Sequence, residues 1–313
     1  MRFRYGELLR SIPIIGITTF EILVRVIKRC ESIIAGIKIW QVKRHLVKDA
    51  EKHYKNIQNL DVSLIGNYYV FHNKSNSLIK FGLNYEPEVH YALKTLINFK
   101  KLKSDHVIFA DISENIGLHS IFVLNSFPST EIIAFDPSPN SYDYLKLTMK
   151  YNKIEKIRLE KIALSEKNGE MDFFTWGANS SGDSFKDTKR LYREIKPKII
   201  KVKSSRLDDL YDMPPLDVIK IDTEGSELEI LRGAINTIKK NQPFIVLEFH
   251  KKNRAAFKVS TSQIFEFLKN IKFSIFSINF ELLSAETFES IQEKYISEDF
   301  ILLPEYYVKS LSF

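Results

Sequence analysis

The sequence predicts an α/β fold built on a doubly wound, mostly parallel sheet. Short apolar segments typical of buried strands recur at regular intervals between 107 and 249, and helical patterns separate most of them. Strands that alternate with helices pair in parallel through right-handed crossovers. Two further apolar segments beyond residue 270 lack a full crossover pattern, which indicates an antiparallel hairpin at one edge. Together these observations predict a seven-stranded sheet.

The five parallel strands are expected at 107–111, 131–135, 157–161, 217–222 and 244–249. Apolar residues at helical spacing lie between most of these strands.

The closing part of the sheet is expected to follow a helix near 261–270, with edge strands at 273–279 and 300–304. The span 164–203 interrupts the regular alternation. It is predicted to carry two inserted strands, 171–175 and 199–203, around a polar loop.

Three regions are expected along the chain. Residues 1–60 form a basic helical N-terminal segment, 61–104 a connector, and 105–313 the α/β domain. Within the connector we expect paired short strands at 68–72 and 78–80, followed by a helix over 86–99 with apolar residues at helical spacing.

Composition places the chain among ordinary globular proteins, with 44% hydrophobic and 27% charged residues in 313. The single cysteine, Cys30, excludes an intrachain disulfide and a cysteine metal cluster. Its scarcity favours a reducing, cytoplasmic setting.

Positive charge is concentrated at the N-terminus. Residues 1–60 hold 12 Lys/Arg and 5 Asp/Glu, an excess of 12 − 5 = +7 that equals the formal charge of the whole chain. The rest of the chain is therefore balanced as a whole, which argues against a nucleic-acid partner, because such binding requires several phosphates to be neutralised together.

The N-terminal apolar run 12–20 is too short to cross a bilayer and contains Pro13 and Gly16. Residues 20–55 follow as one or two helices with a broad apolar face and a basic rim. Such a helix either packs on the main domain or lies on anionic lipid or a partner, so residues 12–55 are a candidate peripheral membrane contact.

The most informative segment runs from Val107 to Asp136: a strand, the turn Asp111–Gly117, a helix, and a strand that ends on a carboxylate. That order brings backbone N–H groups and an acidic side chain to one edge of the sheet, where α/β proteins bind nucleotide-like ligands. A carboxylate such as Asp136 can accept hydrogen bonds from both ribose hydroxyls, which indicates an adenosine-containing cofactor. The one glycine, Gly117, argues against a dinucleotide, and a plain turn remains the alternative.

Two further strand ends carry candidate catalytic groups. Asp222 ends the strand 217–222, and Glu224 begins the next helix. Glu248 lies in the apolar strand 244–249, where a buried carboxylate needs a partner or a cleft. His250, two residues on, is expected on the same face of that strand. Structural roles, as a helix-dipole partner or a surface histidine, are the alternatives for these residues.

These segments, in this order and spacing, resemble the FkbM family of S-adenosylmethionine-dependent methyltransferases. The resemblance covers roughly half of the chain and is strongest in VIKIDTEGSELEILRGA (218–234). AFDPSP (134–139), SRLDDL (205–210) and PFIVLEFH (243–250) agree with it. It implies a Rossmann-like class I methyltransferase fold and transfer of a methyl group to a hydroxyl of a sugar, glycolipid or other small metabolite.

Carried over position by position, the resemblance assigns the methionine end of S-adenosylmethionine to Asp111, Asn115 and Gly117. It assigns the ribose to Asp136 and the adenine to Ala163 and Leu164. The acceptor then faces Asp222, Glu224, Glu248 and His250, with Glu86 at the rim of the site. Ser113 and Glu114 stand where the family has Gly-Ala, so a Cβ and a charge are added beside the methionine end.

The resulting prediction is an O-methyltransferase with a small-molecule or glycan substrate and no required metal. His250 or Asp222 is expected to act as the base, with Glu248 orienting it. Two alternatives remain: a dinucleotide-dependent oxidoreductase, and a degenerate methyltransferase fold that serves as a binding or scaffold subunit.

Overall fold

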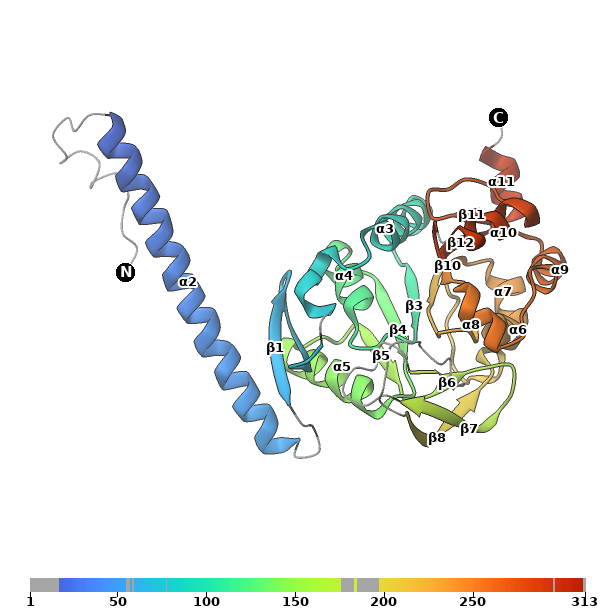
Figure 1. Ribbon diagram of the computed structural model, residues 1–313, viewed down its shortest axis with the longest axis horizontal. Helices are drawn as coiled ribbons and strands as arrows, with labels where there is room; N and C mark the ends of the chain where they lie inside the picture. The colour runs from blue at the N-terminus through green and yellow to red at the C-terminus, as the bar shows by residue number, and fades with distance from the viewer. Residues whose placement is uncertain are drawn as a thin grey trace. The chain divides into compact units, whose positions relative to one another are not determined.

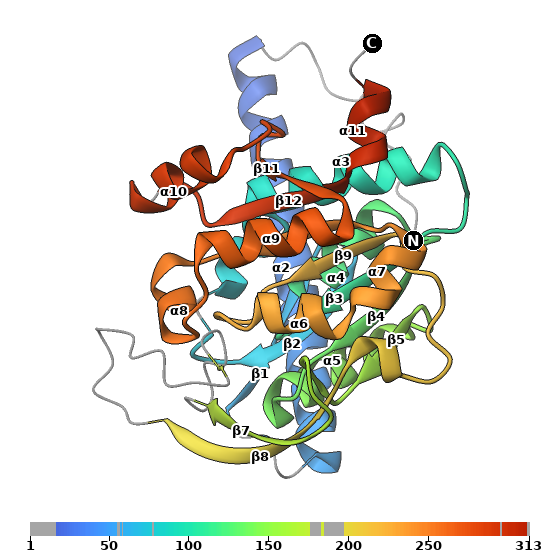
Figure 2. The ribbon, with the colours of Figure 1, turned by 90° about the vertical axis from the view of Figure 1, so that its right-hand side faces the viewer.

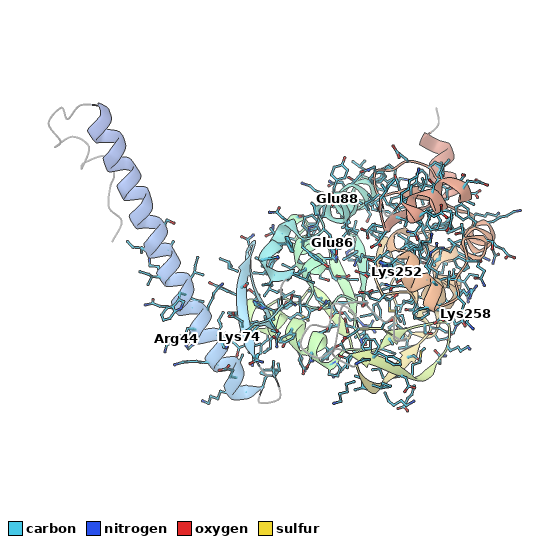
Figure 3. The ribbon with its side chains drawn as sticks, in the orientation of Figure 1. Arg44, Lys74, Glu86, Glu88, Lys252 and Lys258 are labelled. Carbon is cyan, nitrogen blue, oxygen red and sulfur yellow. The ribbon has the colours of Figure 1, made fainter. Side chains whose placement is uncertain are left out.

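The computed structural model describes residues 17–54, 57, 59–76, 78–175, 183–184, 197–294 and 296–311. Most of the expected polar loop 177–189 lies outside these residues. The chain divides into two compact units at His53, so that the predicted connector and the sheet belong to the same unit. The first unit contains one long helix, α2 (Ile17–His53), which bears Arg44 (Figure 3). No described helix has the length and apolar character needed to cross a membrane.

The second unit is an α/β domain (Figure 1). Its strands are β1 (Leu60–Ile65), β2 (Tyr68–Asn73), β3 (Ile108–Ile112), β4 (Glu131–Phe135), β5 (Ile157–Glu160), β6 (Ala163–Leu164), β7 (Gly169–Thr175), β8 (Lys198–Ser205), β9 (Val218–Ile221), β10 (Phe244–Glu248), β11 (Phe273–Ser277) and β12 (Asp299–Pro304). Its helices are η1 (Leu78–Asn84), α3 (Pro87–Lys101), α4 (Leu118–Ser126), α5 (Pro139–Asn152), η2 (Leu207–Asp209), α6 (Glu227–Gly233), α7 (Ile235–Asn241), α8 (Lys251–Ala256), α9 (Thr261–Ile271), α10 (Ala285–Glu293) and α11 (Glu305–Leu311).

The main sheet has the strand order β11-β12-β10-β9-β3-β4-β5. The five strands from β10 to β5 run parallel, and β12 is antiparallel to both of its neighbours. All seven strands begin and end within two residues of the predicted positions. The prediction of a seven-stranded, mostly parallel sheet is confirmed.

Helices cover both faces of this sheet because its strands are apolar on both sides. Alternate residues along β3 point to opposite faces: Phe109 packs with α3, α4 and α5, whereas Ile108 and Ala110 pack with α6, α7 and α9. Figure 2 shows the second set of helices in front of the strands. The same alternation places Lys220 of β9 and Glu248 of β10 on the α3 side.

Two local predictions were wrong. Residues 78–80 belong to the 3₁₀ helix η1 rather than to a strand, because the side chain of Asn76 accepts a hydrogen bond from the backbone N–H of Leu78 (3.0 Å) and caps the helix. The partner of β2 is instead the antiparallel strand β1. The edge strands β11 and β12 are antiparallel as predicted, but helix α10, begun by a capping box at Ser284, connects them.

The insertion after β5 forms a separate three-stranded sheet in the order β6-β8-β7. Strands β7 and β8 pair antiparallel, in agreement with the two inserted strands predicted there. Phe173 of this sheet reaches the main cavity at the carboxyl ends of the parallel strands.

Candidate functional site

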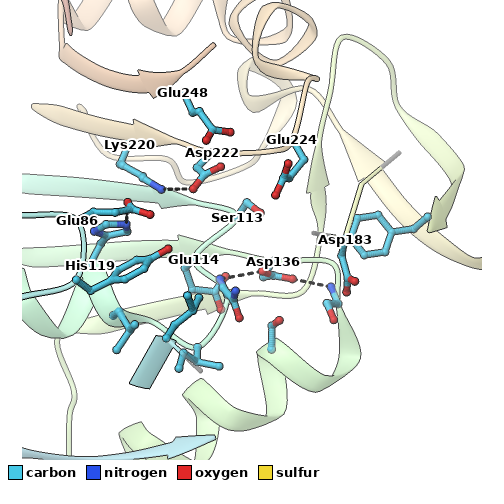
Figure 4. A pocket seen from close by; sticks show the side chains of 18 residues that line it. Glu86, Ser113, Glu114, His119, Asp136, Asp183, Lys220, Asp222, Glu224 and Glu248 are labelled. Carbon is cyan, nitrogen blue, oxygen red and sulfur yellow. Dashed lines mark hydrogen bonds and ion pairs between the residues drawn. The ribbon is translucent and has the colours of Figure 1, made fainter. Parts of the chain in front are cut away.

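A cavity of about 250 Å³ lies at the carboxyl ends of β3, β4, β9 and β10 (Figure 4). Its walls also receive side chains from the start of α3 and from the first turn of α4. The lining is strongly acidic and consists of Leu78, Tyr85, Glu86, Ser113, Glu114, Asn115, Ile116, Leu118, His119, Asp136, Ser138, Ser141, Phe173, Asp183, Lys220, Asp222, Glu224 and Glu248.

The turn between β3 and α4 forms one wall of this cavity. Ser113, Asn115 and Gly117 all have left-handed backbone conformations, with φ of 65°, 56° and 82°. A Cβ on residue 117 would lie 2.7 Å from the Leu145 side chain, so glycine is required there. Serine in this conformation costs about 1–2 kcal/mol, which explains why the family pattern has glycine at position 113.

Asp136, at the end of β4, presents its carboxylate to the cavity. Its Oδ2 accepts a hydrogen bond from the backbone N–H of Asn115 (3.0 Å), and its Oδ1 accepts one from Ser138 (2.7 Å). These two bonds use about half of the carboxylate's lone-pair sites, so Asp136 can accept from further donors. Burial raises the pKa of Asp136 to about 7, against the opposing effect of these two hydrogen bonds. The carboxylate therefore gains or loses its proton near neutrality.

Glu114 lies beside Asp136 and is almost completely buried. No donor among the described residues reaches either of its carboxylate oxygens. Burial, together with the nearby carboxylates of Asp136 and Asp111, raises the pKa of Glu114 well above its usual range. In its protonated form Glu114 donates a hydrogen bond to Asp136, which holds the pKa of Asp136 lower than burial alone would set it.

Two pairs of basic and acidic side chains occupy the end of the cavity near β9. Lys220 Nζ lies 2.8 Å from Asp222 Oδ2, and His119 Nε2 lies 3.2 Å from Glu86 Oε2 (Figure 4). Burial tends to lower the pKa of Lys220, but the carboxylates of Asp222, Glu86 and Asp111 outweigh it and raise that pKa. Burial tends to raise the pKa of Glu86, but the hydrogen bond from His119 and the charge on Lys220 lower it to about 2.

Glu248 has the opposite electrostatic environment. It lies at the end of β10, opposite Asp299 of β12. Burial, followed by the negative charges of Asp222 and Asp299, raises the pKa of Glu248 well above its usual range. Burial also raises the pKa of Asp299, to about 7. Glu248 is therefore a carboxyl group with a strong affinity for a proton.

The turn that follows β9 is held by a buried carboxyl group. Glu227 Oε1 accepts hydrogen bonds from the backbone N–H groups of Thr223 (3.1 Å) and Gly225 (2.9 Å), and from the Thr223 hydroxyl (3.0 Å). Gly225 has a φ of 119°, and a Cβ there would lie 2.6 Å from Phe257. These contacts fix Asp222 and Glu224 at the cavity, where Glu224 Oε2 accepts a hydrogen bond from Asn253 (2.7 Å).

The structure brings most of the predicted site residues together. Those that line the main cavity are Ser113, Asn115, Asp136, Asp222, Glu224 and Glu248, together with Glu86 at its rim. Ala163 and Leu164 line an adjacent cavity of about 20 Å³, which shares Ser113, Phe173 and Asp183 with the main one.

Two predicted residues, Asp111 and Gly117, do not line the cavity but support the residues that do. Asp111 is fully buried, and its Oδ2 accepts a hydrogen bond from the Ser120 hydroxyl (2.6 Å). Gly117 begins α4 and gives its backbone the required conformation. In the described ranges, no set of three histidine, cysteine or acidic side chains is arranged to hold a metal ion.

The structure does not bring His250 to the cavity. Because β10 ends at Glu248, the strand alternation that would place Glu248 and His250 on the same face does not continue to residue 250. His250 instead caps α8: its Nδ1 accepts hydrogen bonds from the backbone N–H groups of Lys252 (3.1 Å) and Asn253 (3.4 Å). Its Nε2 lies 3.0 Å from Glu298 Oε1.

Among the lining residues that the sequence analysis did not identify, three lie near β9 and carry polar or basic groups: Tyr85, His119 and Lys220. Lys220 left a signal, since it is the one charged residue inside the buried strand VIKI, and a buried lysine needs a partner. Tyr85 and His119 left none, because their approach to β9 depends on how α3 and α4 pack.

The sheet order, the antiparallel seventh strand and the cavity at the carboxyl ends define a class I methyltransferase fold. The model of the methyltransferase FkbM domain matches residues 111–275, just over half of the chain. The chain therefore belongs to the FkbM methyltransferase family.

Several characterised proteins are similar to the chain over this region. The 2-O-methyltransferase NoeI of Sinorhizobium fredii is 27% identical, and the match covers 52% of the chain and 69% of that protein. The hexuronic acid methyltransferase AglP of Haloferax volcanii is 26% identical, over 48% of the chain and 59% of that protein. The methyltransferase sdnD of Sordaria araneosa is 26% identical, over 43% of the chain and 67% of that protein.

Among solved structures, the chain is similar to the methyltransferase FkbM from Methylobacillus flagellatus, with 14% identity and a TM-score of 0.41. That match covers 64% of the chain but only 44% of the solved protein.

Proposed function

We propose that the protein is an S-adenosylmethionine-dependent O-methyltransferase that acts on a hydroxyl group of a sugar, glycolipid or other small metabolite. Membership of the FkbM family supports methyl transfer. The single observation that carries the proposal is the continuous cavity between Asp136, at the end of β4, and Asp222 and Glu248, at the ends of β9 and β10. A methyl donor and an acceptor can therefore meet inside one space.

The residues at the cavity fit the proposed cofactor. Asp136 presents its carboxylate to accept hydrogen bonds from the ribose, and its orientation is fixed by two backbone hydrogen bonds. The smaller cavity at Ala163 and Leu164 has mostly apolar walls, which suit contact with an adenine ring, but at about 20 Å³ it is too small to enclose one. Ser113 and Glu114 line the main cavity without filling it, so the two departures from the family pattern leave room for a ligand.

The bound cofactor supplies an electrophilic methyl group, so the chain's own residues mainly align the acceptor oxygen and remove its proton. We assign proton removal to Glu248, because burial and the neighbouring carboxylates raise the pKa of Glu248 well above its usual range, which makes its carboxylate a stronger base than an ordinary one. Asp222, fixed by Lys220, orients the acceptor hydroxyl. His250 has no part in this mechanism, since Glu298 and the start of α8 occupy its ring nitrogens.

The names of two relatives, a 2-O-methyltransferase and a hexuronic acid methyltransferase, support a carbohydrate hydroxyl as the acceptor. The match spans only part of the length of each of these two proteins, so the acceptor class of this chain is a proposal that needs its own test.

Calorimetry with S-adenosylhomocysteine tests the cofactor assignment. We expect the wild-type protein to bind it, and Asp136→Ala to lose binding, because the ribose hydroxyls lose both acceptors. Asp209→Ala, an exposed carboxylate of η2 away from the cavity, is the matched control and should bind normally. Unchanged affinity in Asp136→Ala would contradict the proposal.

The same titrations separate the rival functions. A protein that binds neither S-adenosylmethionine nor S-adenosylhomocysteine would be a methyltransferase fold used as a binding or scaffold subunit. The observation that favours this alternative is the additional carboxyl group of Glu114 in the cavity lining. Fluorescence titration with NADH tests the oxidoreductase alternative, and we expect no binding. Transfer of a labelled methyl group to a panel of uronic acids and glycolipids then identifies the acceptor.

A further inference from the structure

The order of the strands gives the proposed cofactor a direction along the sheet edge. The small cavity at Ala163 and Leu164 lies on the β5 and β6 side, and Asp136 ends β4. The neighbours of β4 in the other direction are β3 and then β9. A ligand whose adenine and ribose occupy the first two positions therefore extends its amino-acid end over β3 toward Lys220 of β9. This step rests on the proposed function.

The amino-acid end of that ligand is a zwitterion, and its carboxylate needs a positive partner. Seven carboxyl groups line the cavity, which is unfavourable for another negative group. Among the described lining residues, Lys220 and His119 are the only ones whose side chains can carry a positive charge. Both are at least 96% buried, and both lie at the β9 end of the cavity.

Lys220 is held in a geometry that suits a zwitterion. Its Nζ lies 2.8 Å from Asp222, and Glu86 contributes a second negative charge nearby. His119 lies 3.2 Å from Glu86 on the opposite side. Positive and negative groups thus alternate, so an incoming ammonium group can approach Asp222 and Glu86 while the adjacent carboxylate approaches Lys220 and His119.

The burial of Lys220 also needs an explanation beyond the fold. A charged lysine in the middle of a parallel strand is expensive to desolvate, and a hydrophobic residue of similar size often stabilises such a position better. Lys220 lies at the carboxyl end of β9, next to the cavity, rather than in the sheet interior. Its retention there is consistent with a ligand that needs its charge.

We propose that Lys220, assisted by His119, binds the carboxylate of the cofactor's methionine moiety and makes the site selective for adenosyl sulfonium ligands that carry this carboxylate. Lys220 is in this role a specificity-determining residue. Asp222 then has two functions: it fixes Lys220 on one side and faces the acceptor on the other.

The test compares S-adenosylmethionine with decarboxylated S-adenosylmethionine, which lacks only the carboxylate. The decarboxylated ligand carries one more net positive charge, so an acidic cavity without a carboxylate-binding group would bind it more tightly. Recognition by Lys220 predicts the reverse. We expect the wild-type protein to prefer S-adenosylmethionine by about tenfold to a hundredfold in calorimetric Kd, the range of a hydrogen bond to a charged group.

Lys220→Met should abolish this preference or reverse it, while the affinity for 5′-methylthioadenosine, which has no amino-acid moiety, stays within about twofold of wild type. Lys220→Arg, which keeps the charge, should retain part of the preference. The matched control is Lys100→Met: Lys100 is also buried, but it contacts Gln242 and Phe244 at the opposite end of β10. It should leave the preference unchanged.

The comparison of the two ligands in the wild-type protein tests the role of Lys220 even if Lys220→Met fails to fold. A wild-type protein that binds both ligands equally, or binds the decarboxylated one more tightly, refutes the role of Lys220 while leaving the methyltransferase proposal intact. Equal losses of 5′-methylthioadenosine and S-adenosylmethionine in a folded Lys220→Met would show a merely structural role. A protein that binds no adenosyl ligand at all refutes both proposals.

Discussion

The protonation state of the Asp136–Glu114 pair should determine how the affinity for the cofactor depends on pH. In the proposed complex the ribose hydroxyls donate to Asp136, so binding requires the ionised carboxylate. Below the pKa of Asp136, which burial raises to about 7, the protein must therefore release a proton when the ligand binds. Affinity for S-adenosylhomocysteine should rise with pH and level off above neutrality.

The size of this effect follows from the protonated fraction of Asp136. With a pKa of about 7, roughly ten in eleven molecules are protonated at pH 6 and roughly one in eleven at pH 8. The apparent Kd should therefore fall about tenfold between pH 6 and pH 8. Calorimetry in two buffers of different ionisation enthalpy should detect the released proton directly.

Substitutions of Glu114 identify the origin of the pH dependence. Protonated Glu114 donates to Asp136 and lowers its pKa, so Glu114→Ala should move the midpoint to higher pH. Glu114→Gln retains an N–H donor of similar size and should leave the midpoint where it is. An affinity that is flat across this range, or that falls as pH rises, would refute the assignment of Asp136 to the ribose.

Three other expectations test the remaining parts of the molecule. Glu248→Gln should lower kcat at least about a hundredfold, as for loss of a general base, with S-adenosylhomocysteine affinity within twofold; an unchanged kcat would exclude Glu248 as the base. Burial raises the pKa of Glu227 to about 7, so the stability it adds in the protonated state is lost as pH rises from about 4.5 to 7. Unfolding experiments should show that the free energy of unfolding falls by about 3 kcal/mol over this pH range because of Glu227. Glu227→Gln should remove this pH dependence, whereas Glu266→Gln, on the exposed face of α9, should leave it in place. The peripheral membrane contact proposed for residues 12–55 predicts that Trp40→Ser, at an exposed position beside Arg44, weakens sedimentation with anionic vesicles; equal sedimentation of both proteins would argue against lipid.

The fold could be predicted largely because its strands are buried on both faces. Strands β3 and β4 are apolar apart from Asp111 and Glu131, which distinguishes them from the surrounding amphipathic helices. Elements at the periphery have weaker patterns. The segment 78–80 is apolar enough for a strand, yet the cap at Asn76 directs it into a 3₁₀ helix.

Individual site residues could be predicted where a strand ends on a polar group. Asp136 and Asp222 follow buried strands, and parallel strands bring their carboxyl ends to one edge. His250 was misplaced because the strand alternation was carried on past Glu248, where β10 ends. His119 and Tyr85 could not be found, since only the packing of α3 and α4 against the sheet brings them to the cavity.

The charges of the cavity link cofactor binding to release of the product. A sulfonium loses its positive charge when its methyl group is transferred, whereas the acidic lining stays in place. Asp222, Glu224 and Glu86 therefore attract the proposed donor more strongly than its product, S-adenosylhomocysteine. Because Lys220 recognises a carboxylate that both ligands share, it contributes equally to the binding of each. In this division of roles, Lys220 sets which ligand enters, and the acidic groups around the methyl position favour exchange of product for donor after each transfer.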